Sequence, residues 1–189
     1  MFCVSVVGFL FLRTRVPGAP IPGHQDFEEV NLRYYVRRND RRGVVFLKEI
    51  VTKRAIAAVA RLLYNENYVA WPMSHRLEGN LAEYRWRRSD RWNHLRVETA
   101  GEPVLAAPGC REEFITEHYQ GYTRQRDGGC LEYRVEHVPW RLWLSSSAEL
   151  SRDAAGLYGH EFTAILSGPP QSDFLAEGSP LAVYQGVRI

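Results

Sequence analysis

The segment 27–36 constrains the fold of this 189-residue chain more than any other. It reads Phe-Glu-Glu-Val-Asn-Leu-Arg-Tyr-Tyr-Val, so polar and apolar residues alternate after its first two positions. Successive side chains of a β-strand point to opposite faces of the sheet. The two faces would carry Glu29, Asn31, Arg33 and Tyr35 on one side and Val30, Leu32, Tyr34 and Val36 on the other. We therefore predict a strand with one apolar face, whose polar face is either solvated or the wall of a pocket.

The polar face of this strand combines a carboxylate, an amide and a guanidinium group. If that face is buried, Glu29 and Arg33 are expected to pair, because a buried unpaired charge carries a large desolvation cost. Arginine binds carboxylates and carbonyls through a fork of N–H donors. Arg33 is therefore the predicted anchor for a ligand, and Glu29 is a candidate acid or base.

Length and composition indicate one domain over residues 1–189, large enough to bury a core. No apolar run approaches the ~20 residues that cross a bilayer, so no membrane association is expected. The apolar start lacks a basic flank and favours a buried strand over a signal peptide. The cysteines, Cys3, Cys110 and Cys130, form neither a disulfide framework nor a metal-ligand spacing. These features predict a cytoplasmic protein.

Strand patterns dominate the rest of the chain and alternate with turn residues. The expected strands are 3–15, 27–38, 43–50, 68–78, 81–89, 92–98, 130–138, 161–167 and 180–187. Apolar residues at helical spacing predict helices at 52–64 and 110–122, with Thr52 as the cap of the first. A third helix, capped by serine, is expected at 147–157. The pattern predicts an α+β fold built mainly from antiparallel sheet.

Lysine is scarce, because Lys48 and Lys53 are the only two in the chain. Alternation places Lys48 on the same strand face as Val44 and Phe46, so this side chain could point inward. A lysine with a depressed pKa can form a Schiff base with a carbonyl substrate. One alternative function is therefore a keto-acid lyase or hydrolase that uses an atypical lysine.

Arginine is abundant in two predicted hairpins, Arg33–Arg42 and Tyr84–Arg96, where it is mixed with tyrosine and tryptophan. Such a mixture occurs on nucleic-acid-binding surfaces. The small net charge of +2 and the turn positions of both clusters favour simple solvation instead. No two histidines stand at metal-ligand spacing, and no cofactor motif is present. We predict no metal and no cofactor, and an arginine-rich nucleic-acid-binding module is the less favoured alternative function.

Several motifs together resemble one family. They are Phe27-x-Glu29-x-Asn31-x-Arg33-x-Tyr35-Val36, Arg61-Leu-Leu-Tyr-x-x-x-Tyr68, Phe114-x-Thr-Glu117-x-Tyr119-x-x-Tyr122, His137-x-Pro-Trp140-x-Leu142 and Pro169-Pro-x-Ser-x-Phe…Gly178-x-x-Leu-x-Val. In order and spacing they are similar to the YqjF-like proteins, domain of unknown function 2071. That family is uncharacterised, bacterial and placed with the acetoacetate decarboxylase-like fold.

The resemblance implies a β-sheet curled into a barrel-like core, with a central cavity and two or three helices. It also implies that the N-terminal part of the family fold is missing, because Met1 falls within the first strand. The open edge left by such a truncation would be compatible with a homodimer. Acetoacetate decarboxylases carry a Schiff-base lysine after a helix, where this chain has Tyr64-Asn-Glu-Asn-Tyr-Val-Ala-Trp. Decarboxylation by that route is therefore not expected.

These arguments predict a protein that binds a small carboxylate- or carbonyl-bearing metabolite in its cavity. The predicted ligand-binding residues are Glu29, Asn31, Arg33, Tyr119, Tyr122, His137 and Trp140. If a reaction occurs, Glu29 and His137 are the candidate acid or base groups. The alternative is that the same side chains form a hydrogen-bonded network that only stabilises the fold.

Overall fold

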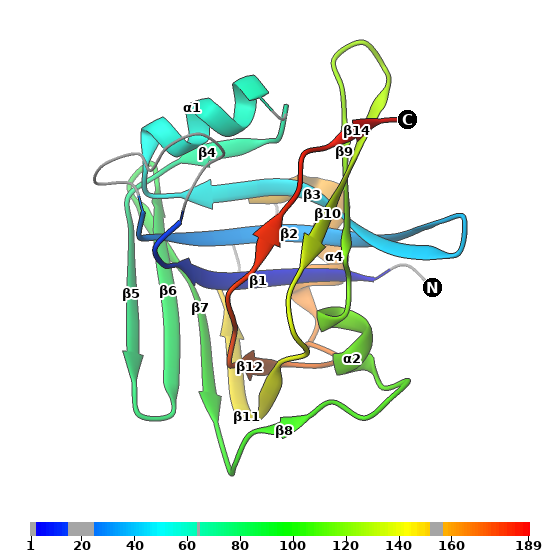
Figure 1. Ribbon diagram of the computed structural model, residues 1–189. Helices are drawn as coiled ribbons and strands as arrows, with labels where there is room; N and C mark the ends of the chain where they lie inside the picture. Colours follow the sequence, from blue (N-terminus) through cyan, green and yellow to red (C-terminus); the bar gives the residue numbers. More distant parts are fainter. Residues whose placement is uncertain (1–2, 15–24, 64, 152–156) are drawn as a thin grey trace.

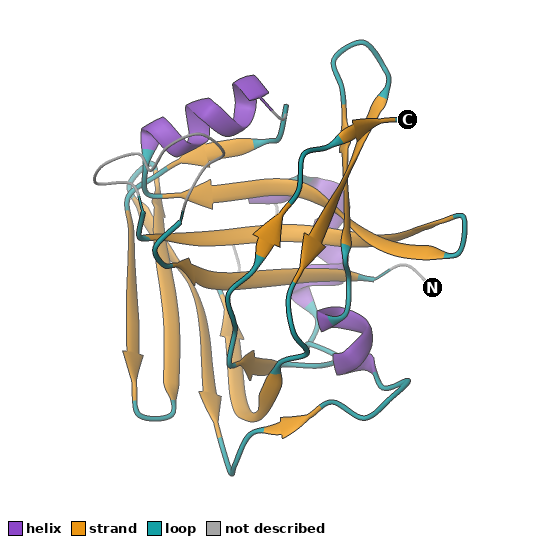
Figure 2. Ribbon diagram, in the orientation of Figure 1, coloured by secondary structure: helices purple, strands orange, loops and turns teal. Residues whose placement is uncertain are grey.

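The computed structural model describes residues 3–14, 25–63, 65–151 and 157–189. Strands form most of it, with helices at the periphery (Figures 1 and 2). The strands are β1 Val4–Phe11, β2 Phe27–Arg38, β3 Arg41–Val51, β4 Tyr68–Ala70, β5 Met73–Glu78, β6 Leu81–Arg88, β7 Arg91–Thr99, β8 Val104–Leu105, β9 Gln120–Arg124, β10 Cys130–Glu136, β11 Arg141–Leu150, β12 Phe174–Ala176, β13 Ala182–Val183 and β14 Val187–Arg188. The helices are α1 Arg54–Leu63, α2 Arg111–Thr116, α4 Thr163–Ser167 and the 3₁₀ helix η1 His160–Phe162. None of the described helices has the length and apolar character needed to span a membrane.

The strands form two sheets. The larger has eight strands in the order β1-β2-β3-β9-β10-β13, with β4 paired to β3 and β14 to β10. The smaller has six strands in the order β12-β11-β7-β6-β5, with β8 paired to β11. In the larger sheet β9, β10 and β13 cross in front of β1, β2 and β3 (Figure 1), so that this sheet is strongly bent.

The expectation of a barrel-like core is wrong in one respect, because the sheets are not closed. Within the described ranges the larger sheet ends at β1 on one side and β13 on the other, and no ladder joins it to the smaller sheet. The two sheets instead bury apolar faces against each other, which removes apolar surface from water without ring closure.

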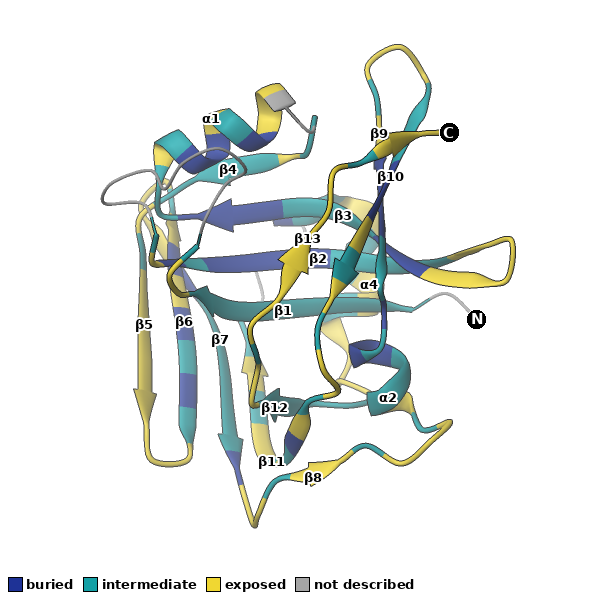
Figure 3. Ribbon diagram, viewed as in Figure 1, coloured by how far each residue is buried: buried dark blue, intermediate teal, exposed yellow. Residues whose placement is uncertain are grey.

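The core between the sheets confirms the alternation predicted for β2. Val30 of β2 and Ile50 of β3 pack with Trp86 of β6, and all three are 0% exposed. Figure 3 shows the buried stretches in the first half of β2, at the end of β3 and at alternate positions of β6. Gly8 of β1 lies against Tyr84, where an added Cβ would meet the ring at 2.7 Å. The polar face of β2 therefore turns toward the inside of the bent larger sheet.

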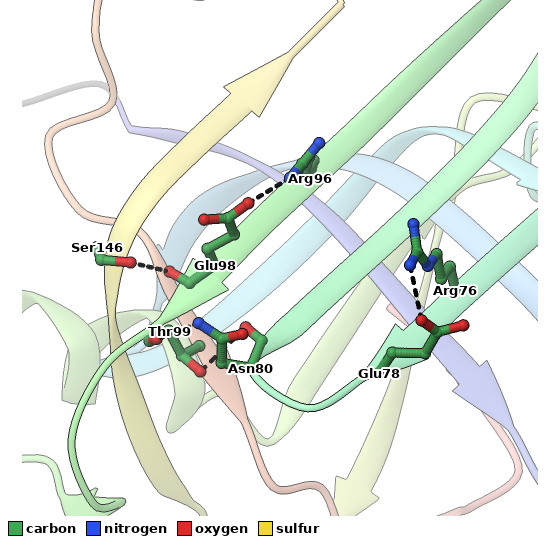
Figure 4. Close-up of polar contacts among 7 residues, drawn as sticks. All are labelled: Arg76, Glu78, Asn80, Arg96, Glu98, Thr99 and Ser146. Atoms are coloured by element: carbon green, nitrogen blue, oxygen red, sulfur yellow. Dashed lines mark hydrogen bonds and ion pairs between the residues drawn. The ribbon is translucent and has the colours of Figure 1, made fainter.

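The outer face of the smaller sheet is polar (Figure 4). Arg76 and Glu78 of β5 form an ion pair of 2.7 Å, and Arg96 pairs with Glu98 on β7. Ser146 of β11 donates to the Glu98 carbonyl at 3.2 Å. Exposed ion pairs of this kind contribute little to stability, so this face serves mainly as a solvated surface.

Helix α1 covers one end of the larger sheet. Ile56 and Ala57 on its buried face pack against Phe27 of β2 and Val51 of β3. Thr52, the predicted cap, donates instead to the Glu28 side chain at 2.5 Å. The hydroxyl therefore ties the start of the helix to the neighbouring strand.

Other predicted elements differ from those observed. Residues 141–150 form strand β11, where a helix was expected from 147, because backbone pairing with β7 and β12 overrides local helix preference. Residues 160–167 form η1 and α4 rather than a strand, since a short apolar run carries no decisive period. The helix expected over 110–122 ends at Thr116, and β9 follows. Predicted positions 15, 64 and 152–156 lie outside the described residues.

Candidate functional site

A cleft of about 2470 Å³ lies along the inner face of the bent sheet. Glu29, Asn31 and Arg33 project into it from β2, as the alternation predicted. Single ligand sites usually occupy about 300–1000 Å³, so a small metabolite would fill only part of this space. The polar residues of the cleft are gathered around Glu29, Asn31 and Arg33, and the candidate site is described from this region.

Glu29 is held by two hydrogen bonds in this region. Asn31 Nδ2 donates to Oε1 at 3.0 Å, and the Tyr68 hydroxyl donates to Oε2 at 3.1 Å. Glu29 is 1% exposed. The expected pairing with Arg33 is wrong: among the described residues no ion pair joins them, and Arg33 Nη2 donates to the Ile115 carbonyl at 3.4 Å. The neutral side chains of Asn31 and Tyr68 thus take the place of the expected ion pair with Arg33 as the hydrogen-bond partners of Glu29.

Glu49 of β3 is the second buried carboxyl group. It lies directly opposite Asn31 in the β2–β3 ladder and beside Tyr68 in the β3–β4 ladder. Glu49 is 2% exposed, and its Oε2 has no hydrogen-bond partner. An unpartnered buried carboxyl oxygen costs free energy, which a bound group could recover.

Glu66 supplies the third carboxyl group, from the segment just before β4. Its Oε1 accepts hydrogen bonds from the Tyr133 hydroxyl of β10 at 3.0 Å and from Thr123 Oγ1 of β9 at 3.2 Å. Glu66 therefore connects the segment before β4 to strands β9 and β10 of the same sheet. We call Glu29, Glu49 and Glu66 the carboxyl cluster.

Burial raises the pKa of every member of the carboxyl cluster. For Glu29, burial raises the pKa to about 7, although hydrogen bonds from Asn31 and Tyr68 oppose the rise. Burial, with repulsion from Glu66 and Glu29, holds the pKa of Glu49 well above its usual range. Burial also raises the pKa of Glu66. Glu29 can therefore hold or release a proton near neutral pH.

A β-bulge decides which side chain of β3 enters the cleft. In the β2–β3 ladder Leu32 pairs with Lys48 but Arg33 pairs with Phe46, so Leu47 is an extra residue. The bulge breaks the alternation, and Glu49 rather than Lys48 lies on the face of Phe46. The expected shared face of Lys48 and Phe46 is therefore wrong.

Lys48 turns away from the cleft and donates to the Leu157 carbonyl. Burial, together with repulsion from Arg88, lowers the pKa of Lys48. Neither Lys48 nor Lys53 is among the described residues that line the cleft. A Schiff base inside the cleft thus has no lysine to form it.

Arg33 and His118 form the opposite, donor-bearing end of the polar region. Arg33 Nε and both ring nitrogens of His118 are buried without hydrogen-bond partners. Burial, with repulsion from Arg33 and Arg42, lowers the pKa of His118 to about 4. His118 is therefore neutral at physiological pH, and Arg33 is the cation of this end.

The predicted aromatic wall is only partly assembled. The His137 ring stacks on Trp140 with centroids 4.3 Å apart, and both residues line the cleft. Tyr119 lies behind His137 with centroids 5.0 Å apart, and its hydroxyl donates to Glu117. Tyr122 pairs with Glu132 across the β9–β10 ladder, whereas Gly121 pairs with Tyr133. Tyr122 therefore points to the face opposite Tyr133, away from the carboxyl cluster.

Sequence reasoning missed much of the carboxyl end. Tyr68 stands in a motif already noted, but nothing in the sequence marked it as a hydrogen-bond donor to Glu29. Glu49 could have been found only by anticipating the bulge, and His118 was assigned to a helix that ends at Thr116. The missed residues are Glu49, Glu66, Tyr68, His118 and Tyr133.

The expectations about metal ions and nucleic acid can also be compared with the structure. Among the described residues, no group of three or more His, Cys, Asp or Glu side chains is arranged to hold a metal ion. In the first arginine-rich hairpin, Arg38 and Arg41 pair with Glu132 at 3.2 and 2.8 Å. The nucleic-acid alternative gains no support from arginines that are engaged within the chain.

Known proteins share the sequence pattern and the fold. Residues 2–180 match the model of the DUF2071 family, described as an uncharacterized conserved protein. The uncharacterized protein YqjF of Bacillus subtilis (strain 168) is 27% identical over 181 residues, covering 91% of this chain and 74% of that protein.

Among solved structures, an acetoacetate decarboxylase from Legionella pneumophila superposes with a TM-score of 0.57 at 13% identity, over 83% of this chain and 65% of that one. The enduracididine biosynthesis enzyme MppR, complexed with pyruvate, gives 0.51 at 10% identity, over 69% of this chain and 55% of that one. The chain thus spans less than two thirds of the length of both solved structures. With a family match over nearly its whole length and an acetoacetate decarboxylase-like fold, the chain belongs to the DUF2071 family.

Proposed function

We propose that this protein binds a small carboxylate- or carbonyl-bearing metabolite at the polar end of the cleft. The observation that carries the proposal is the convergence of buried, unpartnered polar atoms on one space. These atoms are Asn31 Oδ1, Arg33 Nε, Glu49 Oε2 and the ring nitrogens of His118. A fold that buries polar groups usually satisfies them, so atoms left open toward a cleft indicate a missing partner.

Arg33 is the proposed anchor. Its Nε faces no protein acceptor, and neutral His118 beside it adds a further hydrogen-bonding group without competing for the anion. A carboxylate placed there gains charge-assisted hydrogen bonds in a site shielded from water. The carboxyl cluster repels an anion, so it orients the ligand with its carboxylate toward Arg33.

The related fold of MppR accommodates pyruvate, which carries both a carboxylate and a carbonyl. This likeness supports the size and class of ligand. Because no lysine lines this cleft, the proposed binding does not use a Schiff base.

Substitution of Arg33 tests the proposal. We expect wild-type protein to bind 4-oxopentanoate or acetoacetate in isothermal titration calorimetry, and Arg33→Met to weaken that binding about ten- to hundredfold. Methionine keeps the apolar stem and removes only the guanidinium group.

Arg37→Met is the matched control, because Arg37 lies on the same strand but is exposed and pairs with Asp40. It should leave the affinity unchanged. Equal affinities of wild type and Arg33→Met, or no binding of any carboxylate to wild type, would contradict the proposal.

A further inference from the structure

When its carboxyl groups are ionised, the carboxyl end of the cleft has more hydrogen-bond acceptors than donors. The hydrogen bonds that neutral donors make at this end run from Asn31 Nδ2 and the Tyr68 hydroxyl to Glu29, and from the Tyr133 and Thr123 hydroxyls to Glu66. None of these hydrogen bonds reaches Glu49 Oε2, which has no partner.

Asn31 shows the same imbalance independently of the carboxyl groups. It is 1% exposed, lines the cleft and has its Oδ1 unpartnered, although its Nδ2 is bonded. Asn31 and Glu49 are direct neighbours across the β2–β3 ladder. When Glu49 is ionised, two open acceptors therefore lie side by side in a buried place that already holds further carboxyl oxygens.

We propose that the carboxyl end of the cleft binds a cationic N–H group, so that the ligand is a small amino- or guanidino-carboxylate. The inference rests on the proposed function, because Arg33 still takes the carboxylate of the same ligand. An N–H cation supplies the missing donors to Glu49 Oε2 and Asn31 Oδ1, and its charge offsets that of the carboxyl cluster. A carbonyl would add one more acceptor to a place already rich in them.

The spacing of the two ends limits the ligand. Arg33 and Asn31 are two residues apart on β2, which corresponds to about 7 Å along an extended strand. The cationic nitrogen and the carboxylate of the ligand must therefore be separated by a short chain of a few atoms. 4-Guanidinobutanoate meets this requirement.

The pH dependence of the affinity should distinguish a cationic ligand from a carbonyl ligand, because the two favour different protonation states of the carboxyl cluster. A bound cation favours the ionised carboxyl groups, so binding releases protons and the affinity rises with pH. A bound carbonyl needs a protonated carboxyl group as donor, so binding takes up protons and the affinity falls with pH. The charged and titratable groups around Glu49 are Glu29 and Arg33 on β2, Glu66 before β4, Tyr68 on β4 and Tyr133 on β10.

The experiment compares three probes that share a carboxylate: 4-guanidinobutanoate, 4-oxopentanoate and pentanoate. Calorimetric titrations at pH 6 and pH 8, each in two buffers of different ionisation enthalpy, give the affinity and the number of protons exchanged. We expect 4-guanidinobutanoate to bind at least about tenfold more tightly than 4-oxopentanoate at pH 8, with proton release.

Glu49→Gln keeps the size of the side chain and removes its charge. It should abolish the tenfold preference for the guanidino probe over 4-oxopentanoate and reduce proton release. Glu98→Gln, on the outer face of the smaller sheet, should change none of these values.

The outcomes separate the two proposals. Binding of 4-oxopentanoate as tight as that of 4-guanidinobutanoate, proton uptake, or an unchanged preference in Glu49→Gln would overturn the cationic ligand but leave the Arg33 site in place. Failure of all three probes to bind would overturn the carboxylate site itself and the inference with it.

Discussion

Glu49 is a residue that the fold leaves incompletely satisfied. Its side chain is 2% exposed, one carboxyl oxygen lacks a partner, and two other carboxyl groups raise its pKa in addition to burial. A group in this position opposes folding when it is ionised and is retained at a cost in stability. Such residues are frequent in binding and catalytic sites.

The pH dependence of stability should report this cost. The folded protein keeps a proton on Glu49 that the unfolded chain releases above its ordinary pKa of 4.5. The associated stability is present in full below that pH and is lost as the pH rises through the higher pKa of the folded state. We expect Glu49→Gln to increase the free energy of unfolding by about 1–3 kcal/mol at pH 8 and to have little effect near pH 4.

Urea denaturation at the two pH values measures this difference. Glu136→Gln is a suitable control, because the Glu136 side chain is 60% exposed and should show no pH-dependent effect. A gain of equal size for Glu49→Gln at pH 4 and pH 8 would show that the charge of Glu49 is not the cause.

At the scale of the elements, the close approach of β9 and β10 positions Tyr133. Gly121 lies directly opposite Tyr133 in the β9–β10 ladder, and a Cβ added to Gly121 would lie 2.1 Å from the Tyr133 ring. Because glycine has no side chain, the tyrosine can fold across the neighbouring strand and reach Glu66.

Gly121→Ala should therefore displace Tyr133. We expect a loss of about 1–3 kcal/mol in the free energy of unfolding, together with weaker binding of carboxylate ligands. Gly168→Ala is the control, since nothing lies within 4 Å of the Cβ added there. Chemical denaturation of the two variants measures the effect, and a neutral Gly121→Ala would contradict the close packing.

Strand β2 illustrates what the sequence can predict. Its alternation gave both faces correctly, because the side-chain period of a strand follows from backbone geometry alone. The bulge at Leu47 and the strand character of 141–150 depend on which strand pairs with which, and local sequence does not contain that information. For the same reason Glu49 and Glu66, brought to Glu29 by tertiary structure, were not predicted as part of the site.

At the scale of the whole molecule, strand β2 belongs both to the core and to the lining of the cleft. One face forms the core with the smaller sheet, and the other lines the cleft. The apolar side chains of β2 therefore determine how firmly the polar ones are held. Stability and ligand binding should respond together to damage in this core.

Leu32→Ala tests how much this core contributes to stability. Leu32 is 0% exposed, so its truncation should cost about 2–5 kcal/mol in the free energy of unfolding. Leu62→Ala, at a position that is 78% exposed, should change stability by less than about 0.5 kcal/mol. Urea denaturation of both variants provides the measurement, and similar midpoints would argue against a shared core under the cleft.

The bulge in β3 has a consequence for how the chemistry of such a cleft can change. Lys48 and Glu49 are adjacent in the chain, and the extra residue at Leu47 places the carboxyl group inside and the amine outside. A regular ladder over the same residues would pair Lys48 instead of Glu49 with Asn31, and so would exchange the two without any substitution. The pairing register of one strand, as much as the identity of its residues, thus selects between an acidic and a basic cleft.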